Sequence, residues 1–82
     1  MNKDKIFEMI KITVNDILPD VDLEQITMDD SLKDIGANSV DRMDIIIDVM
    51  EKLDLKIPFM EFGELKNIRE IVNLLAQKKG ID

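Results

Sequence analysis

The sequence contains no cysteine and no histidine among its 82 residues. Without cysteine, the chain cannot form a disulfide, a thiolate metal site or a thiol nucleophile. Without histidine, it lacks the most common general base of enzymes and the most common transition-metal ligand. A site built from carboxylates and lysines stays conceivable, but so short a chain leaves little volume for a closed pocket. We therefore expect a protein without catalysis of its own and without a metal site.

Basic residues are also scarce, with 11 Lys and Arg against 18 Asp and Glu, for a net charge of −7. Because proteins neutralise nucleic-acid phosphates with clustered Lys and Arg, this composition disfavours nucleic acid, and equally an anionic membrane surface. The longest apolar runs, such as residues 45–47, are three residues long, and residues 1–8 do not resemble a signal peptide. The composition predicts a monomeric binding or carrier module in the cytoplasm.

Three stretches of the sequence show apolar residues at steps of three and four, the spacing of an amphipathic helix. The first is Lys3–Leu18, which Pro19 should end, the second is Val40–Leu53, and the third is Ile68–Gln77. Around the third stretch, Asn67 is a candidate N-cap and Gly80 follows the expected end. No segment alternates with period two for long, so the predicted fold class is all-α.

The expected second helix carries two kinds of side chain in register. Its apolar stripe, predicted to face the core, comprises Val40, Met43, Ile46, Ile47, Val49, Met50 and Leu53. Its carboxylates alternate with that stripe at Asp41, Asp44, Asp48 and Glu51. These carboxylates share one broad face, because residues three and four positions apart are neighbours on a helix surface.

The two connections between these helices differ in character. The first, residues 19–38, is a long loop that Ile26, Leu32 and Ile35 can attach to the core, with Ser31 able to cap a short turn. The second, residues 56–66, should contain a short helix in which Phe59 and Phe62 close the end of the bundle. The predicted architecture is a small four-helix bundle, three main helices and one short one, forming a single domain over residues 1–82.

Ser39 is the one position where the pattern indicates chemistry. Gly36 permits a tight turn, and Ser39 then stands directly before the second apolar-periodic run. The simplest structural interpretation is that Ser39 is the N-cap of this helix. A catalytic triad is excluded for lack of histidine, although serine–lysine chemistry with Lys33 stays conceivable. A third interpretation is that Ser39 is modified, because the positive end of a helix dipole favours a phosphodiester.

The segment Asp34–Val40 reads Asp-Ile-Gly-Ala-Asn-Ser-Val. It resembles the Asp-Leu-Gly-Ala/Gly-Asp-Ser-Leu signature of acyl carrier proteins, and the similarity continues without gaps to Ile57-Pro58. The resemblance implies an acidic helical bundle that holds acyl groups as thioesters on a phosphopantetheine arm, which a transferase attaches to Ser39 from coenzyme A. Asn38 and Val40 depart from the usual Asp and Leu of fatty-acid carriers.

The stretch Gly36–Met43 is similar to stand-alone carriers of polyketide pathways, in particular those that accompany a β-branching cassette. There a hydroxymethylglutaryl-synthase-like enzyme adds a carbon unit, and the free-standing carrier holds the acetyl or malonyl donor. The implied partners are a phosphopantetheinyl transferase and acyltransferase, ketosynthase-like and hydroxymethylglutaryl-synthase-like enzymes with basic docking patches. A peptidyl, aminoacyl or fatty-acid carrier stays open, as does a small acidic adaptor in which Ser39 is only a cap.

The carboxylates of the expected second helix are poorly neutralised, because Arg42 and Lys52 are the only basic residues between Ser39 and Leu53. This face is either a solvated surface or a field that steers basic partners. The resemblance implies the second interpretation, since this helix is the usual docking element of carriers. We define the docking face by its candidate residues, which are Val40, Asp41, Arg42, Met43, Asp44, Ile47, Asp48 and Glu51.

Overall fold

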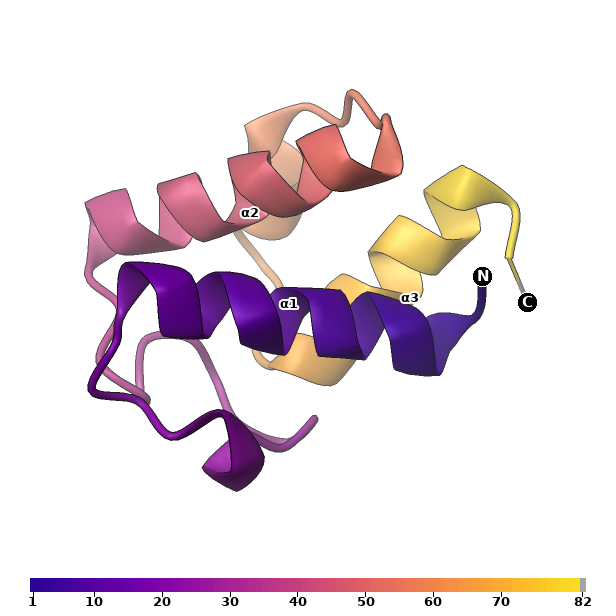
Figure 1. Ribbon diagram of the computed structural model, residues 1–82. Helices are drawn as coiled ribbons and strands as arrows, with labels where there is room; N and C mark the ends of the chain where they lie inside the picture. The colour runs from indigo at the N-terminus through magenta and orange to yellow at the C-terminus, as the bar shows by residue number, and fades with distance from the viewer. Residues whose placement is uncertain (82) are drawn as a thin grey trace.

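The computed structural model describes residues 1–81 and consists of three α-helices joined by irregular segments (Figure 1). The helices are α1 (Lys3–Ile17), α2 (Ser39–Leu53) and α3 (Ile68–Lys79), and the connections contain two 3₁₀ turns, η1 (Leu23–Gln25) and η2 (Phe59–Phe62). No β-strand occurs in the described range. The predicted all-α bundle is confirmed, and its expected short fourth helix is the single 3₁₀ turn η2.

Side-chain caps define the ends of α1 and α3. The Lys5 amide donates to Asn2 Oδ1 at the start of α1, and the Glu70 amide donates to Asn67 Oδ1 at the start of α3. At the other end of α3, Gly80 adopts φ 78°, a left-handed conformation that suits glycine. Asn67 and Gly80 therefore have the roles that the sequence predicted.

The long loop between α1 and α2 is attached to the rest of the molecule along its length. Ile26 and Leu32 are buried, Ile35 is half-buried, and Ser31 Oγ accepts a hydrogen bond from the Asp34 amide at 3.0 Å. The backbone amides of Ile68 and Arg69 donate to loop carbonyls at 2.9 Å each, which binds the loop to the start of α3. These contacts fix the backbone of the loop that leads into the N-terminus of α2.

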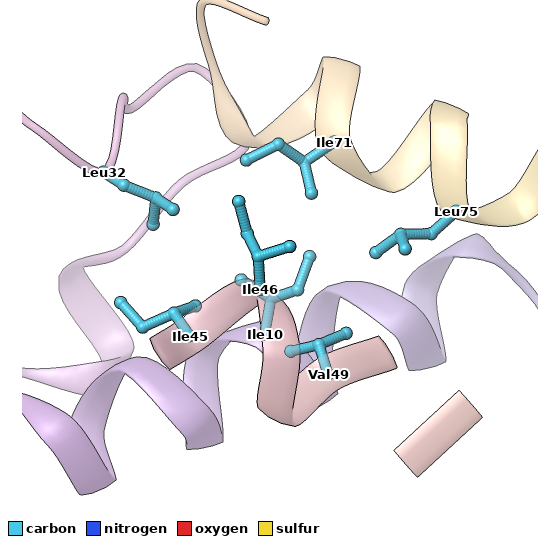
Figure 2. A pocket seen from close by; sticks show the side chains of 7 residues that line it. All are labelled: Ile10, Leu32, Ile45, Ile46, Val49, Ile71 and Leu75. Atoms are coloured by element: carbon cyan, nitrogen blue, oxygen red, sulfur yellow. The ribbon is translucent and has the colours of Figure 1, made fainter. Parts of the chain in front are cut away.

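Helix α1 packs against both other long helices and runs opposite to them (Figure 1). Its buried side chains Ile6, Ile10 and Val14 are all at most 1% exposed. Where α1, α2, α3 and the loop meet, their side chains point toward a common void of about 10 Å³ (Figure 2). The side chains around it are Ile10, Leu32, Ile45, Ile46, Val49, Ile71 and Leu75.

The prediction that the whole apolar stripe of α2 faces the core is wrong for one side of the stripe. Val40, Met43 and Ile47 are 66%, 45% and 38% exposed, whereas Ile45, which the stripe omitted, is 1% exposed. The residues of α2 that enter the core are Ile45, Ile46, Val49, Met50 and Leu53. The apolar arc of α2 is wider than the surface that α1, α3 and the loop cover, so part of it faces outward.

The expected closure of the bundle end by two phenylalanines is half right. Phe62 is buried, but Phe59 is 39% exposed, and the two ring centroids lie 6.2 Å apart in a tilted arrangement. Both rings belong to η2, where residues three positions apart lie on the same side of the 3₁₀ turn, so the two rings follow one another along the segment and the core covers only Phe62. Phe59 therefore forms part of the surface beside α2.

One polar contact joins α1 to α2 in a way that the periodicity does not predict. Thr13 is 1% exposed, and its hydroxyl donates to the Met9 carbonyl at 2.8 Å. Lys52 donates its ammonium to Thr13 Oγ1 at 2.9 Å. One of the two basic residues of α2 is therefore directed toward α1. None of the helices in residues 1–81 has the length and apolar character needed to cross a bilayer.

Candidate functional site

The first turn of α2 is capped by Asn38. Asn38 Oδ1 accepts a hydrogen bond from the Asp41 amide at 2.8 Å, and the Asn38 amide donates to Asp41 Oδ2 at 3.2 Å. This reciprocal pair is a capping box. The interpretation of Ser39 as the N-cap is therefore wrong: Ser39 is the first residue of the helix itself, because the side chain before it already satisfies the free amide.

Gly36 makes the approach to this cap possible. Its φ of 109° is a conformation that residues with a Cβ rarely adopt, and the Ala37 amide beyond it donates back to the Leu32 carbonyl. Ala37 itself is buried, at 2% exposed. The chain thus turns on glycine, inserts an alanine into the core and emerges at Asn38, which leaves Ser39 on the surface.

The hydroxyl of Ser39 is exposed and free of capping duty. Within residues 1–81 its one hydrogen bond comes from Arg42, whose Nη2 lies 3.4 Å from Ser39 Oγ. The other guanidinium nitrogen, Nη1, donates to the Ala37 carbonyl at 3.0 Å. Lys33 makes no hydrogen bond to Ser39 in this range, so the lysine considered as a base does not contact the hydroxyl. The arrangement leaves the Ser39 hydroxyl accessible from solvent.

A groove of about 530 Å³ starts at Ser39 and runs between α2 and the two connecting segments. The α2 side of the groove is formed by Ser39, Arg42, Met43 and Ile46, and Lys33 and Lys66 line it elsewhere. Phe59, Phe62 and Leu65 make much of the opposite wall. The groove is thus mainly apolar, with cationic side chains along its length.

The docking face consists of an exposed apolar part, an exposed acidic part and two residues that form hydrogen bonds within the chain. The exposed apolar part is Val40, Met43 and Ile47, and the exposed acidic part is Asp44, Asp48 and Glu51. Asp41 and Arg42 are half-buried, because Asp41 belongs to the capping box and Arg42 folds back toward Ala37. At 100° per residue, the apolar part lies between the buried side of α2 and the carboxylates.

Within residues 1–81, the three exposed carboxylates of this face form no ion pair. The ion pairs within residues 1–81 join Lys11 to Glu8, Arg69 to Asp29 and Lys78 to Glu61, all away from α2. Lys52, on α2 itself, reaches Thr13 instead. The field of Asp44, Asp48 and Glu51 is therefore not neutralised locally.

Three features of the site were missed by reasoning from the sequence. The capping role of Asn38 was readable in principle, because an Asx residue three positions before an acidic residue is the pattern of a capping box. The contact of Arg42 with Ser39 follows from their separation of three positions on a helix, but the companion contact with Ala37 depends on the turn at Gly36. The groove involves residues from α2, α3 and both connecting segments, which no local pattern reveals.

Comparison with known proteins identifies the family to which the chain is similar. Residues 10–75 match the family model described as phosphopantetheine attachment site. The chain is 41% identical over 78 residues to the polyketide biosynthesis acyl-carrier-protein AcpK of Bacillus subtilis, covering 95% of both chains. It is 32% identical to an acyl carrier protein of Petrotoga mobilis, over 100% of this chain and 96% of the relative.

A solved structure agrees with these relatives in sequence and in fold. A crystal structure of the curacin-pathway HMG synthase in complex with an acetyl-donor ACP contains a chain that superposes with a TM-score of 0.87 at 40% identity. The match covers 95% of this chain and 100% of that one. The phosphopantetheine-attachment model, the identities to carriers and the shared helical fold together lead to one conclusion: this chain belongs to the acyl carrier protein family, whose cofactor is phosphopantetheine.

Proposed function

We propose that Ser39 is the residue that bears the phosphopantetheine arm. The sequence has two serines, and Ser31 is engaged in capping a turn of the loop, whereas Ser39 presents a hydroxyl that no cap uses. In the attachment step, Ser39 Oγ forms a bond to the phosphorus of the phosphopantetheinyl group. The bond from that phosphorus to the nucleotide phosphate of coenzyme A breaks, and the hydroxyl proton is released.

The arm supplies the reactive group that the polypeptide lacks. Its terminal thiol holds an acyl group as a thioester, so the absence of cysteine and histidine is no obstacle to the role of a carrier. Catalysis then belongs to the partner enzymes, which are a phosphopantetheinyl transferase and enzymes that load or consume the acyl group. The whole chain, residues 1–82, acts as one carrier domain in this proposal.

The pathway that we propose is polyketide biosynthesis, with this carrier as the acetyl or malonyl donor for β-branching. The observation that carries this proposal is the match to a chain of the HMG synthase–acetyl-donor ACP complex. That match covers 100% of the other chain from within an 82-residue protein, so the chain matched has the size of the carrier, not of an enzyme. The 41% identity to AcpK, a polyketide carrier, points the same way.

We further propose that partners bind on the docking face. Its exposed apolar residues Val40, Met43 and Ile47 give a small contact area next to Ser39, and its unpaired carboxylates attract a basic patch on the partner. Such a surface suits brief encounters, because the carrier has to leave each enzyme after transfer. Asp41 and Arg42 are half-buried, and we include them in this face because they follow Ser39 by two and three positions.

The attachment site is tested by intact mass after incubation with coenzyme A and a promiscuous transferase. Wild type and Ser31→Ala should both gain the mass of one phosphopantetheinyl group, whereas Ser39→Ala should gain none. Modification that persists in Ser39→Ala, or that is lost only in Ser31→Ala, contradicts the assignment. Failure of wild type to load would instead favour an acidic adaptor without an arm.

The pathway is tested by loading Ser39 with an acetyl group and offering the carrier to two enzymes. One is a hydroxymethylglutaryl-synthase-like enzyme with a β-ketoacyl acceptor carrier, and the other is a fatty-acid ketosynthase supplied with malonyl carrier. We expect efficient acetyl transfer to the first and little to the second. The opposite preference would overturn the donor role and favour a fatty-acid carrier.

A further inference from the structure

The guanidinium of Arg42 is held in a defined place beside the attachment hydroxyl. Nη1 donates to the Ala37 carbonyl at 3.0 Å, and Nη2 faces Ser39 Oγ at 3.4 Å. Because Ala37 is buried and its backbone amide is hydrogen-bonded to Leu32, the carbonyl that anchors the guanidinium is itself fixed. Arg42 is half-buried, which further restricts the range of positions that its side chain can adopt.

The contact between Arg42 and Ser39 is long for a hydrogen bond to a neutral hydroxyl. Once Ser39 Oγ becomes an ester oxygen, the phosphorus bonded to it carries two further oxygens that share a negative charge. Because these oxygens lie beyond Oγ, one of them can come closer to Arg42 Nη2 than Oγ itself does. Guanidinium groups bind phosphate oxygens strongly, because the interaction is charge-assisted and the planar fork matches their geometry.

No other cation of the described chain is placed to take this role. Lys33 and Lys66 line the groove but make no hydrogen bond to Ser39, and Lys52 is directed to Thr13. The carboxylates of the docking face would repel a phosphodiester that swung over them. Arg42 is thus the group that favours one direction for the arm.

That direction is the groove, since Ser39 and Arg42 both line its α2 side. The void in the core is too small to hold an acyl chain, at about 10 Å³, the space of roughly one water molecule (Figure 2). Leu32, Ile46 and Ile71 line both the void and the groove, so these side chains separate the two. An arm with a short acyl group therefore has room in the open groove, between Met43 and Phe59, but not in the core.

We propose that Arg42 is a positioning residue that binds the phosphodiester of the arm and directs the pantetheine part and a short acyl group into the groove beside α2. This inference rests on the attachment of the arm to Ser39. A partner that docks on α2 then has to draw the arm out of the groove. The arm is held close to the docking face between encounters, with one side of it against the groove.

The test uses the loaded full-length carrier, with attachment at Ser39 verified by mass. Proton NMR should show nuclear Overhauser effects from the geminal methyl groups of the arm to the Met43 methyl and the Phe59 ring. The phosphorus resonance should be shifted from that of the free diester, measured on the same loaded carrier unfolded in urea. In Arg42→Gln we expect these contacts to weaken several-fold and the phosphorus shift to approach the free value. The matched control is Arg69→Gln, which removes the other arginine of the sequence, does not touch the lining of the groove and should keep both signals.

The amide spectrum of α2 shows whether Arg42→Gln is folded. If it is not, a salt titration of the wild-type carrier serves instead, because added sodium chloride should weaken the contacts and move the phosphorus resonance toward its free position. Loaded wild type without contacts to Met43 or Phe59, or folded Arg42→Gln with unchanged contacts, overturns the inference. Failure to load Ser39 is a different result and overturns the proposed attachment site.

Discussion

Ile45 and Ile47 stand two positions apart on α2 and face opposite environments. Ile45 is 1% exposed and lines the core void together with side chains from α1, α3 and the loop (Figure 2). Ile47 is 38% exposed and lies next to the unpaired carboxylates. The same side chain thus contributes to the core at one position and, in the docking face that we propose, offers contact area to a partner at the other. This division of α2 leads to the first prediction.

Replacing Ile45 with Ala should lower the free energy of unfolding by about 2–5 kcal/mol, because it leaves a cavity in the core. The same substitution at Ile47 should cost less than about 1 kcal/mol, since the side chain is already part of the surface. Urea unfolding followed by circular dichroism measures both. Loading by the transferase should show the reverse order among folded variants, with Ile47→Ala the slower substrate. Equal destabilisation by the two changes would contradict this description of α2.

The capping box at the start of α2 predicts a different order for two neighbouring residues. Asn38→Ala should destabilise the fold by about 1 kcal/mol through loss of the N-cap. Ser39→Ala should change stability by no more than about 0.5 kcal/mol, because its hydroxyl makes no capping bond. Asn38→Asp is the control, since it retains a capping oxygen. If Ser39→Ala destabilised the protein more than Asn38→Ala in urea titrations, Ser39 and not Asn38 would be the N-cap.

The exposed carboxylates of α2 predict a rate that depends on salt. Reversing Asp44 and Asp48 to Lys should slow loading by the transferase about tenfold at low ionic strength, because steering by opposite charges accelerates association. The difference should shrink as salt is added. The matched control reverses Asp20 and Glu24, two exposed carboxylates outside α2, with the same change in net charge. Similar slowing by the control would mean that net charge, and not this face, sets the rate.

The hydrogen bond from Lys52 to Thr13 predicts a coupling between α1 and α2. Thr13→Val keeps the volume of the buried side chain but removes the acceptor, and we expect it to cost about 1 kcal/mol of stability. Lys52→Met removes the donor and should cost less, because the buried Thr13 hydroxyl keeps its own hydrogen bond to the Met9 carbonyl. A double-mutant cycle from unfolding curves measures the coupling. Additive effects of the two changes would show that the contact contributes nothing to stability.

Much of the fold was determined by local sequence alone. The bounds of α1 and α3 lie within two residues of those predicted, because Asn67, Gly80 and Pro19 impose backbone conformations regardless of what packs nearby. Gly36 and the serine after it likewise placed the candidate site, since a turn followed by an apolar-periodic run is a local pattern. The family resemblance was also readable without the fold, because it rests on a contiguous stretch of sequence from Asp34 to Pro58.

Only the tertiary structure decided which part of the wide apolar arc of α2 is buried. Periodicity gives the spacing of apolar residues around a helix, but α1, α3 and the loop determine how much of the arc is covered, and they leave Val40, Met43 and Ile47 outside. The contact of Arg42 with the Ala37 carbonyl and the groove beyond Ser39 likewise exist only once the loop is folded against α2 and α3. The sequence alone determined the helices and the hydroxyl, because both follow from neighbouring residues. Their surroundings required contacts between segments far apart in the chain.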